Sequence, residues 1–457
     1  MTDTVYDMVI LGAGSGGYAA ALRGAQLGLT VALVEADKVG GTCLHRGCVP
    51  TKAVLHAAET ADAVREASAL GISATFEGVD MARLQRYKNG IVTRMYKGLQ
   101  GLVSSRGIEF VQGWGRLVST DTIEVEGRRL TGRNVVLASG SYSKTIGQEV
   151  SGPVMTSEQA LELDRVPASA VILGGGVIGV EFASAWASLG STVTIIEALP
   201  HLVPNEDEAI SRQLERAFRK RRIAYRTSTM FERVERYDGG VRVHTADGKA
   251  YDAEVLLIAV GRGPATANLG YEEVGVAMDR GFVLADAYGR TNVPGVWAVG
   301  DIVPGVQLAH RGFAQGIVVA EKIAGLDPRP VDDVTVPKVT FCSPEIASVG
   351  LSESRAKEIH GAENIETAEF NIAGNAKSQI LGTQGFVKMV SVKGGPIVGF
   401  HAIGARMGEQ VGEGQLIVSW EADAADVASL IHAHPTQNET IGEAAMALAG
   451  KPLHNHG

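Results

Sequence analysis

Residues 5–35 read VYDMVILGAGSGGYAAALRGAQLGLTVALVE, and this stretch decides the fold. The apolar run 5–11 predicts a strand, a glycine-rich turn follows, and the alanine-rich run 18–27 predicts a helix. A second expected strand, 30–35, ends in an acid. A G-x-G-x-x-G turn between a strand and a helix, with an acid about 20 residues further on, indicates a dinucleotide-binding unit. The turn glycines are Gly12, Gly14 and Gly17, and the acid is Glu35.

The same unit recurs 162 residues later, where the sequence from Ala170 reads AVILGGGVIGVEFASAWASLGSTVTIIE. Two unrelated glycine turns would rarely agree at so many positions. In such units the glycines permit a tight turn, close approach of a pyrophosphate and packing of helix on strand, and the acid accepts hydrogen bonds from ribose hydroxyls. The pyrophosphate lies at the helix N-terminus. The repeated residues are Gly174, Gly176, Gly179 and Glu197.

This duplication predicts an α/β fold with two Rossmann-like dinucleotide-binding domains and two adenine dinucleotides. Glu197 would repel the 2′-phosphate of NADP, and the next five residues, ALPHL, contain no arginine that could bind it. The second unit is therefore expected to prefer NAD.

Composition excludes several other classes of protein. The chain has 457 residues and a net charge of −9, which argues against a nucleic-acid partner. No apolar run approaches the roughly 18 residues of a membrane span, and no signal peptide is recognisable, so no membrane association is expected. We expect a cytoplasmic location, where structural disulfides are rare.

Two of the three cysteines lie close together in residues 40–52, GGTCLHRGCVPTK. Cys43 and Cys48 follow the first dinucleotide unit directly, so they could exchange two electrons with a flavin bound there. A helix that begins near Pro50 would lower their thiol pKa. From the residues alone, a zinc site or a pair of inert buried cysteines stays open, although no second cysteine pair is present to complete a zinc site. We interpret Cys342, the third cysteine, as structural.

This loop resembles the redox-active disulfide signature of the flavoprotein disulfide reductases, the class I pyridine nucleotide-disulfide oxidoreductases. Further motifs follow in the family's order along essentially the whole chain: ASGS (138–141), AVGRGP (259–264), VWAVGDI (296–302), LAH (308–310), PEIASVG (344–350) and HAHPTQNE (432–439). The resemblance implies FAD in the first unit, NAD in the second, a Cys43–Cys48 redox disulfide and no metal. It also implies a C-terminal α+β interface domain that forms a homodimer.

The resemblance assigns roles to further residues. Lys52 and Glu181 would pair beside the flavin, although a surface lysine and an ordinary helical glutamate are the bland alternative. Asp301 would hold the ribityl chain. Other flavin contacts are expected at Thr42, Gly115, Ser139 and Ala309, and a nicotinamide dinucleotide contact at Gly261.

His434 and Glu439 form the last expected pair. An imidazole is the best base for a thiol near neutral pH, and a carboxylate on its other nitrogen fixes its tautomer. Five residues with Pro435 between them do not lie on one helix face, so the two would meet across a turn. The resemblance makes His434 the base and Glu439 its partner, with His432 as a neighbour that could be mistaken for the base.

Within the family, HAHPTQNE and LVPNED (202–207) most closely resemble the dihydrolipoyl dehydrogenases. The chain lacks the C-terminal cysteine pair of mercuric reductases and the 2′-phosphate arginines of glutathione reductases. The implied reaction is oxidation of dihydrolipoamide by NAD, with lipoyl domains of a 2-oxo acid dehydrogenase complex as partner. The alternatives are an NADH-dependent reductase of another low-molecular-weight disulfide and a non-catalytic flavin redox sensor.

We expect four regions: an FAD-binding domain (1–148), an NAD-binding domain (149–268), a central segment that completes the FAD domain (269–337) and an interface domain (338–457).

Overall fold

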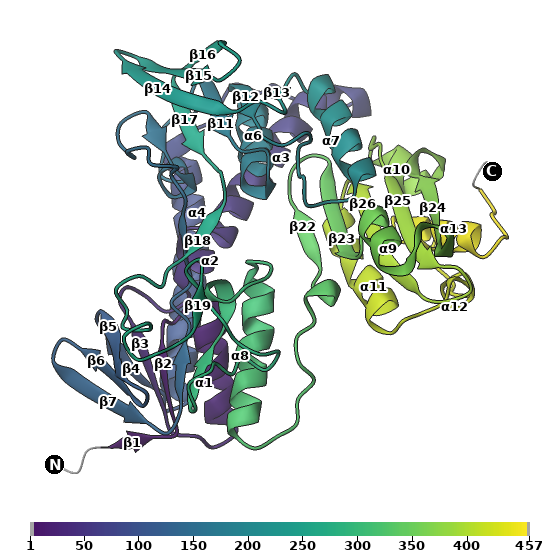
Figure 1. Cartoon of the computed structure of the whole chain (residues 1–457). Coiled ribbons are helices and arrows are strands. Elements are labelled where there is room, and N and C mark those ends of the chain that lie inside the picture. The colour runs from purple at the N-terminus through teal and green to yellow at the C-terminus, as the bar shows by residue number, and fades with distance from the viewer. Residues whose placement is uncertain (1–3, 455–457) are drawn as a thin grey trace.

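The structure is a computed structural model that describes residues 4–454. Three bodies, each built on its own β-sheet, lie at the lower left, the top and the right of Figure 1. The first body has a parallel sheet in the order β21 (Val296–Ala298), β8 (Val135–Leu137), β2 (Met8–Leu11), β3 (Val31–Glu35) and β4 (Glu109–Gln112). Because β21 comes from much later in the chain, a central segment returns to this body.

Both faces of this first sheet are covered. Met8 and Ile10 of β2 pack toward helices α1 (Ser15–Gln26) and α8 (Ala309–Ile323), which lie side by side. Val9 and Leu11 point to the other face, because side chains alternate along a strand. That face is covered by a mixed sheet in the order β1 (Val5–Tyr6), β7 (Arg128–Gly132), β6 (Thr122–Val125) and β5 (Gly115–Ser119).

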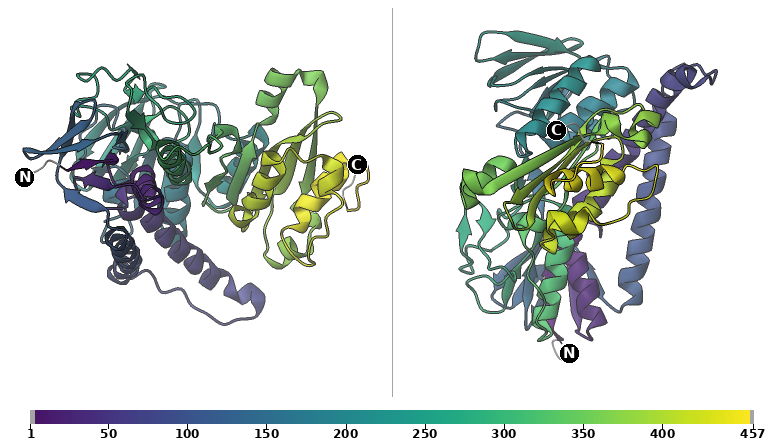
Figure 2. Two further views of the ribbon diagram at one scale, coloured as in Figure 1. Left: turned by 90° about the horizontal axis from the view of Figure 1, so that it is seen from below. Right: turned by 90° about the vertical axis from the view of Figure 1, so that its right-hand side faces the viewer.

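A helical hairpin connects the first body to the second. Short helix α2 (Gly41–His45) leads into α3 (Cys48–Glu66), which packs against α4 (Met81–Ser105) and against α6 (Val177–Leu189) of the second body. The right view of Figure 2 shows this hairpin projecting from the molecule. The N-terminus of α3 lies two residues before the expected helix start at Pro50.

The second body repeats the parallel arrangement. Its strands lie in the order β10 (Val154–Met155), β17 (Val255–Ile258), β11 (Ser169–Leu173), β12 (Thr192–Ile196) and β13 (Ala224–Arg226). Its helices are α5 (Ser157–Ala160), α6 (Val177–Leu189) and α7 (Glu208–Lys220), and an antiparallel sheet of β14 (Phe231–Tyr237), β15 (Gly240–Thr245) and β16 (Ala250–Ala253) lies beside it. A ribbon of β9 (Ser141–Ser143) and β18 (Arg262–Pro264) joins the two bodies, and β19 (Met278–Asp279) pairs with β20 (Phe282–Val283) in the returning segment.

The third body is an antiparallel sheet with helices. The strands lie in the order β22 (Lys338–Thr340), β23 (Glu345–Gly350), β26 (Ile397–Gly404), β25 (Phe386–Val392) and β24 (Ile365–Asn371). Its helices are α9 (Glu353–His360), α10 (Ala376–Ile380), α11 (Met407–Ser419), α12 (Ala424–Val427) and α13 (Glu439–Leu448). This is the expected α+β architecture.

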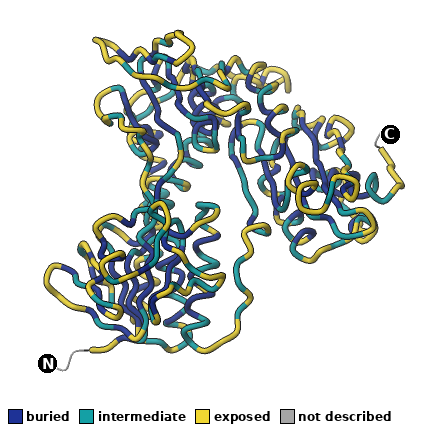
Figure 3. Tube along the Cα trace, viewed as in Figure 1, coloured by how far each residue is buried: buried dark blue, intermediate teal, exposed yellow. Residues whose placement is uncertain are grey.

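Burial follows the sheets. The central strands of all three bodies are dark blue in Figure 3, and every residue of β2 and of β17 is buried. Near-continuous apolar runs are typical of parallel strands that are covered on both faces. Within residues 4–454, none of the helices is both long and apolar enough to cross a bilayer.

One expected element differs from the structure. The run 5–11 forms two strands, β1 and β2, which part at Asp7. The Asp7 carboxylate accepts hydrogen bonds from the backbone and the hydroxyl of Thr30, and this side-chain pairing interrupts the strand. The four domain boundaries given above stay a prediction.

Candidate active site

The first glycine turn closes so tightly that side chains are excluded. Gly12 has a φ of +103°, and a Cβ atom there would lie 2.3 Å from the carbonyl oxygen of Ala138. A Cβ atom at Gly17 would lie 1.8 Å from the carbonyl oxygen of Gly12. Gly14 caps α1 without a side-chain hydrogen bond, so the first N–H groups of the helix remain available for a pyrophosphate. Glu35 accepts from the backbone N–H groups of Ala13 at 2.8 Å and Asp37 at 2.9 Å.

The second turn has the same geometry. Gly174 has a φ of +100°, and a Cβ atom there would lie 2.4 Å from the carbonyl oxygen of Ala259. A Cβ atom at Gly179 would lie 1.9 Å from the oxygen of Gly174. Gly176 caps α6 and has no protein atom within 4 Å of its Cβ position, so a pyrophosphate can approach. Both turns therefore fit a dinucleotide.

Glu197 directly follows strand β12, beside the second turn. Its side chain accepts from the backbone N–H groups of Gly175 at 2.6 Å and Leu199 at 2.7 Å. These bonds orient the carboxylate, whose remaining lone pairs can accept from ribose hydroxyls. Gly261, after β17, has a φ of +100° and an open Cβ position.

The two cysteines lie at a break between helices. Cys43 belongs to α2, and Cys48 is the first residue of α3, where the helix dipole favours an anion. Both are free thiols in the structure. A hydrogen bond from the Cys43 thiol, aided by the charge of Lys52, lowers the pKa of Cys48 to about 7, and the same hydrogen bond together with burial raises the pKa of Cys43. Cys48 is therefore the thiolate of the pair.

The redox loop is pressed against the first turn. Gly41 has a φ of +57°, and a Cβ atom there would lie 2.7 Å from the Cα atom of Gly14. Thr42, its neighbour in α2, has a carbonyl that accepts from the Arg46 N–H at 2.9 Å. A dinucleotide on the N-terminus of α1 would therefore lie next to the cysteine loop.

Lys52 and Glu181 meet across the first and second bodies. The Lys52 Nζ atom lies 2.9 and 2.8 Å from the two carboxylate oxygens of Glu181, which is buried. The Phe341 backbone N–H also donates to Glu181 at 2.9 Å, and Lys52 lies over the Phe341 ring, 4.9 Å from its centre. A groove of about 1820 Å³ extends from Lys52 between α3, α7 and the third sheet.

Asp301 is the end point of a hydrogen-bonded chain. The Ser141 hydroxyl donates to the Asp301 carboxylate and accepts from the Arg262 Nε–H at 2.7 Å. Arg262 also donates to the Ser141 carbonyl at 2.7 Å and to the Ser143 hydroxyl at 3.1 Å. Sequence reasoning missed Arg262 and Ser141, although both stand in quoted motifs.

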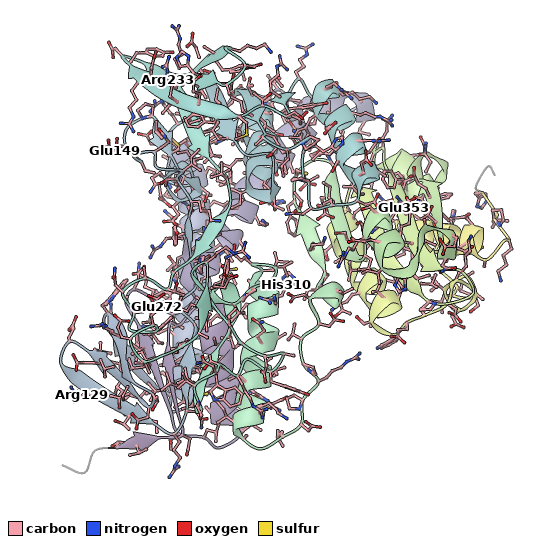
Figure 4. All side chains as sticks on the ribbon, in the orientation of Figure 1. Arg129, Glu149, Arg233, Glu272, His310 and Glu353 are labelled. Carbon is pink, nitrogen blue, oxygen red and sulfur yellow. The ribbon has the colours of Figure 1, made fainter. Side chains whose placement is uncertain are left out.

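The remaining expected flavin contacts are placed as follows. Ala309 begins α8, and the helix has no side-chain cap, so its first N–H groups are open. Ser139 shares a 2.9 Å hydrogen bond with the buried Tyr271 hydroxyl. Gly115 is buried, and a Cβ atom there would lie 2.6 Å from Leu11 and 2.8 Å from Val34, so packing alone requires glycine there. Figure 4 shows His310, next to Ala309, at the linker to the third body, where its Nε2 atom lies 2.7 Å from the Pro337 carbonyl.

His434 and Glu439 are joined in the third body. The His434 Nδ1 atom lies 2.7 Å from a Glu439 oxygen, and the Thr436 N–H donates to the other oxygen at 2.8 Å. Burial raises the pKa of Glu439, but the hydrogen bonds from Thr436 and His434 outweigh it and hold that pKa below its usual range. The ionised carboxylate fixes the imidazole through Nδ1. The His434 side chain is 71% exposed, and its Nε2 atom has no hydrogen-bond partner within residues 4–454.

His434 does not lie near the cysteines of its own chain. Figures 1 and 2 place the segment between α12 and α13 on the outer part of the third body, whereas α2 lies in the first body. The cysteine loop instead has Tyr18 of α1 beside it. Burial, with Cys43 as a neighbour, raises the pKa of Tyr18 to about 12. Sequence reasoning missed this residue.

Cys342 takes no part in this site as a nucleophile. It is 2% exposed, its thiol donates to the Pro344 carbonyl, and burial raises its pKa. A buried neutral thiol is inert.

The structure has two dinucleotide-binding turns, and the first of them lies against the Cys43–Cys48 loop, in which the pKa of Cys48 is lowered. This combination defines an enzyme that passes electrons between a nicotinamide nucleotide and a disulfide. The chain belongs to the pyridine nucleotide-disulphide oxidoreductase family: residues 6–316 match that family, and residues 336–445 match its dimerisation domain. The expected family and fold class are confirmed.

Similar proteins cover the whole chain. It is 36% identical to a dihydrolipoyl dehydrogenase of Bacillus subtilis, over 99% of both chains, and 37% identical to that of Geobacillus stearothermophilus, over 98% and 97%. Among solved structures, it resembles LpdA of Mycobacterium tuberculosis with a TM-score of 0.90 and 26% identity, over 96% and 99% of the chains. It also resembles the HOCl-induced flavoprotein disulfide reductase RclA of Escherichia coli, with a TM-score of 0.86 and 27% identity, over 96% and 99%.

Proposed function

We propose that this enzyme oxidises dihydrolipoamide to lipoamide with NAD as the acceptor, using FAD and the Cys43–Cys48 pair. The observation that carries the proposal is the position of the two cysteines in a loop against the first dinucleotide turn, where the Cys43 thiol and the charge of Lys52 lower the pKa of Cys48. Its relatives along the full chain are dihydrolipoyl dehydrogenases, which supports this choice of substrate within the family.

The reaction begins with the cysteines joined as a disulfide. His434 takes the proton from one substrate thiol, and the resulting thiolate attacks the sulfur of Cys43. The Cys43–Cys48 bond breaks, and Cys48 leaves as the thiolate that its low pKa favours. The second substrate thiol then attacks the first substrate sulfur and closes the cyclic disulfide. Cys43 leaves and accepts the proton of that second thiol, while the first proton stays on His434. The substrate has lost two electrons and the cysteines have gained them.

FAD, when bound in the first cradle, supplies the two-electron carrier between the dithiol and NAD. Gly14 with the N-terminus of α1, the ribose acceptor Glu35 and Asp301 would hold it. Lys52 would place a positive charge beside the flavin, and the buried Glu181 would hold that charge in place. Gly176, Glu197 and Gly261 would hold NAD in the second cradle.

We further propose a homodimer in which each active site is shared. The match to a dimerisation domain and the separation of His434 from its own cysteines support this arrangement. A heterodimer tests it, with Cys43→Ser in one chain and His434→Ala in the other. Each homodimer should be nearly inactive with lipoamide, whereas the heterodimer should have one intact site and about half the normal activity, by two-fold symmetry. An inactive heterodimer with normal flavin content would contradict the shared site.

A substrate panel tests the reaction itself. NADH oxidation should be fastest with lipoamide and slow with glutathione disulfide or linear disulfides. The likeness to RclA supports one alternative, an NADH-dependent reductase of another small disulfide. Faster turnover of another disulfide would favour that alternative, and no turnover of any disulfide would favour a redox sensor. The His434–Glu439 pair argues against a sensor, which needs no proton transfer.

Two finer proposals concern context. The physiological dithiol would be carried on the lipoyl domains of a 2-oxo acid dehydrogenase complex, and the enzyme would act in the cytoplasm. A pull-down with an isolated lipoyl domain, compared with the same domain lacking the lipoyl group, tests the first.

A further inference from the structure

A carboxylate on α11 contacts both sides of the segment that carries the base. One oxygen of Glu413 lies 2.7 Å from the His432 Nε2 atom, and the other accepts from the Asn438 amide at 2.7 Å. His432 stands two residues before His434, and Asn438 four residues after it. A single side chain therefore brackets the base.

The two contacts are well placed to hold the segment. The His432 side chain is 11% exposed and packs against Gly442 of α13, where a Cβ atom would lie 2.6 Å from its Nδ1 atom. The hydrogen bond that His432 donates to the Glu413 carboxylate outweighs burial and raises the pKa of His432, so this bond is charge-assisted. The charged groups that act on His432 are Glu413 and, from α13, Glu439.

Few contacts hold the side chain of the base, His434, directly. The His434 ring is mostly exposed and has the hydrogen bond to Glu439. Other bonds anchor the C-terminal half of the segment: the Asn375 amide donates to the Thr436 carbonyl at 3.0 Å, and the Gln437 amide donates to the Ala405 carbonyl at 2.8 Å. On the N-terminal half, the His432–Glu413 bond is the tie to α11.

We propose that Glu413 is a positioning residue for the proton base: by holding His432 and Asn438 on α11, it keeps His434 in line with the substrate thiol. This proposal rests on the proposed function, because a base is needed for a dithiol substrate. The proposal gives His432 the role of holding the segment on α11, whereas the sequence analysis identified His432 only as a neighbour of the base.

Glu413→Gln and Glu413→Ala test the proposal in the FAD-loaded dimer. Because a small misplacement of a catalytic group costs up to about a hundredfold in rate, kcat with dihydrolipoamide should fall roughly tenfold in Glu413→Gln and more in Glu413→Ala. KM for dihydrolipoamide should stay within about twofold, since substrate docking is untouched. NADH oxidation by ferricyanide needs no thiol base and should keep its normal rate.

The chain offers a matched control. Glu443 of α13 makes the same kind of pair, at 2.7 Å, but with His454 of the C-terminal tail and not with the base segment, so Glu443→Gln should leave kcat unchanged. His432→Gln combined with Asn438→Ala should reproduce the effect of Glu413→Ala, because both remove the same clamp.

Two results would overturn the proposal. A normal kcat in Glu413→Ala would show that the residue does not position the base. A ferricyanide rate that falls in parallel with kcat would show that the substitution damages the enzyme in general. If the unmodified enzyme reduces no lipoamide, the proposed function has failed instead.

Discussion

In the first dinucleotide unit, Gly14 faces Gly41 of the cysteine loop, whereas its counterpart in the second unit, Gly176, has no protein atom within 4 Å of its Cβ position. The turns themselves are closely alike. Gly12 and Gly174 have φ angles of +103° and +100°. If either carried a side chain, it would collide with the carbonyl of the residue after a neighbouring strand, Ala138 after β8 or Ala259 after β17. The two turns thus have the same backbone geometry but different surroundings.

This difference shows where chemistry is added to a duplicated fold. The turn, the helix N-terminus and the acid recur in both units because they bind the part that the two cofactors share. The reactive groups lie in what packs against the turn. Only the first turn has a dithiol loop beside it, so the first unit passes electrons to a disulfide and the second exchanges them with a soluble nucleotide.

The largest effects should come from the third glycine of each turn. Gly17→Ala places a Cβ atom 1.8 Å from a backbone oxygen, so the protein should lose FAD and its yellow colour. Gly179→Ala, with a 1.9 Å clash, should keep FAD but no longer be reduced by NADH. Absorbance spectra before and after NADH addition measure both. Gly101→Ala on α4, where no atom lies within 4 Å, is the control. Equal flavin loss in both turn variants would show that the units do not work separately.

Substitution of the two acids, Glu35 and Glu197, should have smaller effects on the binding of FAD and NADH than substitution of the glycines. Loss of a charged hydrogen bond costs about 1.5–3 kcal/mol, so Glu197→Ala should raise KM for NADH roughly ten- to a hundredfold without releasing FAD. Glu35→Ala should weaken FAD retention during dialysis and leave KM for NADH unchanged. The unmodified enzyme should prefer NADH to NADPH. Equal use of both nucleotides would refute the role given to Glu197.

The smallest effect concerns the loop that only the first unit has. In the reduced enzyme, alkylation of Cys48 should have a midpoint near pH 7, because its thiolate is stabilised by the Cys43 thiol. Cys43→Ala removes that donor, so the thiolate is less favoured and the midpoint should rise toward the ordinary value of about 8.5. Iodoacetamide rates measured from pH 5 to about 10 give both midpoints. A midpoint that stays or falls in Cys43→Ala would contradict the hydrogen bond.

Sequence patterns were sufficient where local chemistry decides the structure. A glycine that must adopt positive φ, such as Gly12, and a strand that is apolar throughout, such as β2, are readable from neighbouring residues alone. The resemblance also led to the pairs Lys52–Glu181 and His434–Glu439, which the structure joins by hydrogen bonds. Their roles in catalysis stay predictions.

Other features depend on contacts between distant parts of the chain. Glu413 looks like any helical glutamate until the fold places it beside His432 and Asn438. Arg262 stood in a quoted motif, yet its partner Ser141 is 121 residues away. The break at Asp7 likewise depends on Thr30, which the strand pairing brings alongside. No spacing rule within a segment could give these partners.

The Arg262–Ser141–Asp301 chain has a mechanical consequence. It starts one residue after Gly261, in the ribbon that joins the two nucleotide bodies, and ends on the carboxylate expected to hold the ribityl chain. A rotation of the second body would pull on β18, and the rigid guanidinium would transmit that displacement through the Ser141 hydroxyl to Asp301. The ribbon therefore links the two nucleotide-binding units by side-chain hydrogen bonds as well as by backbone pairing.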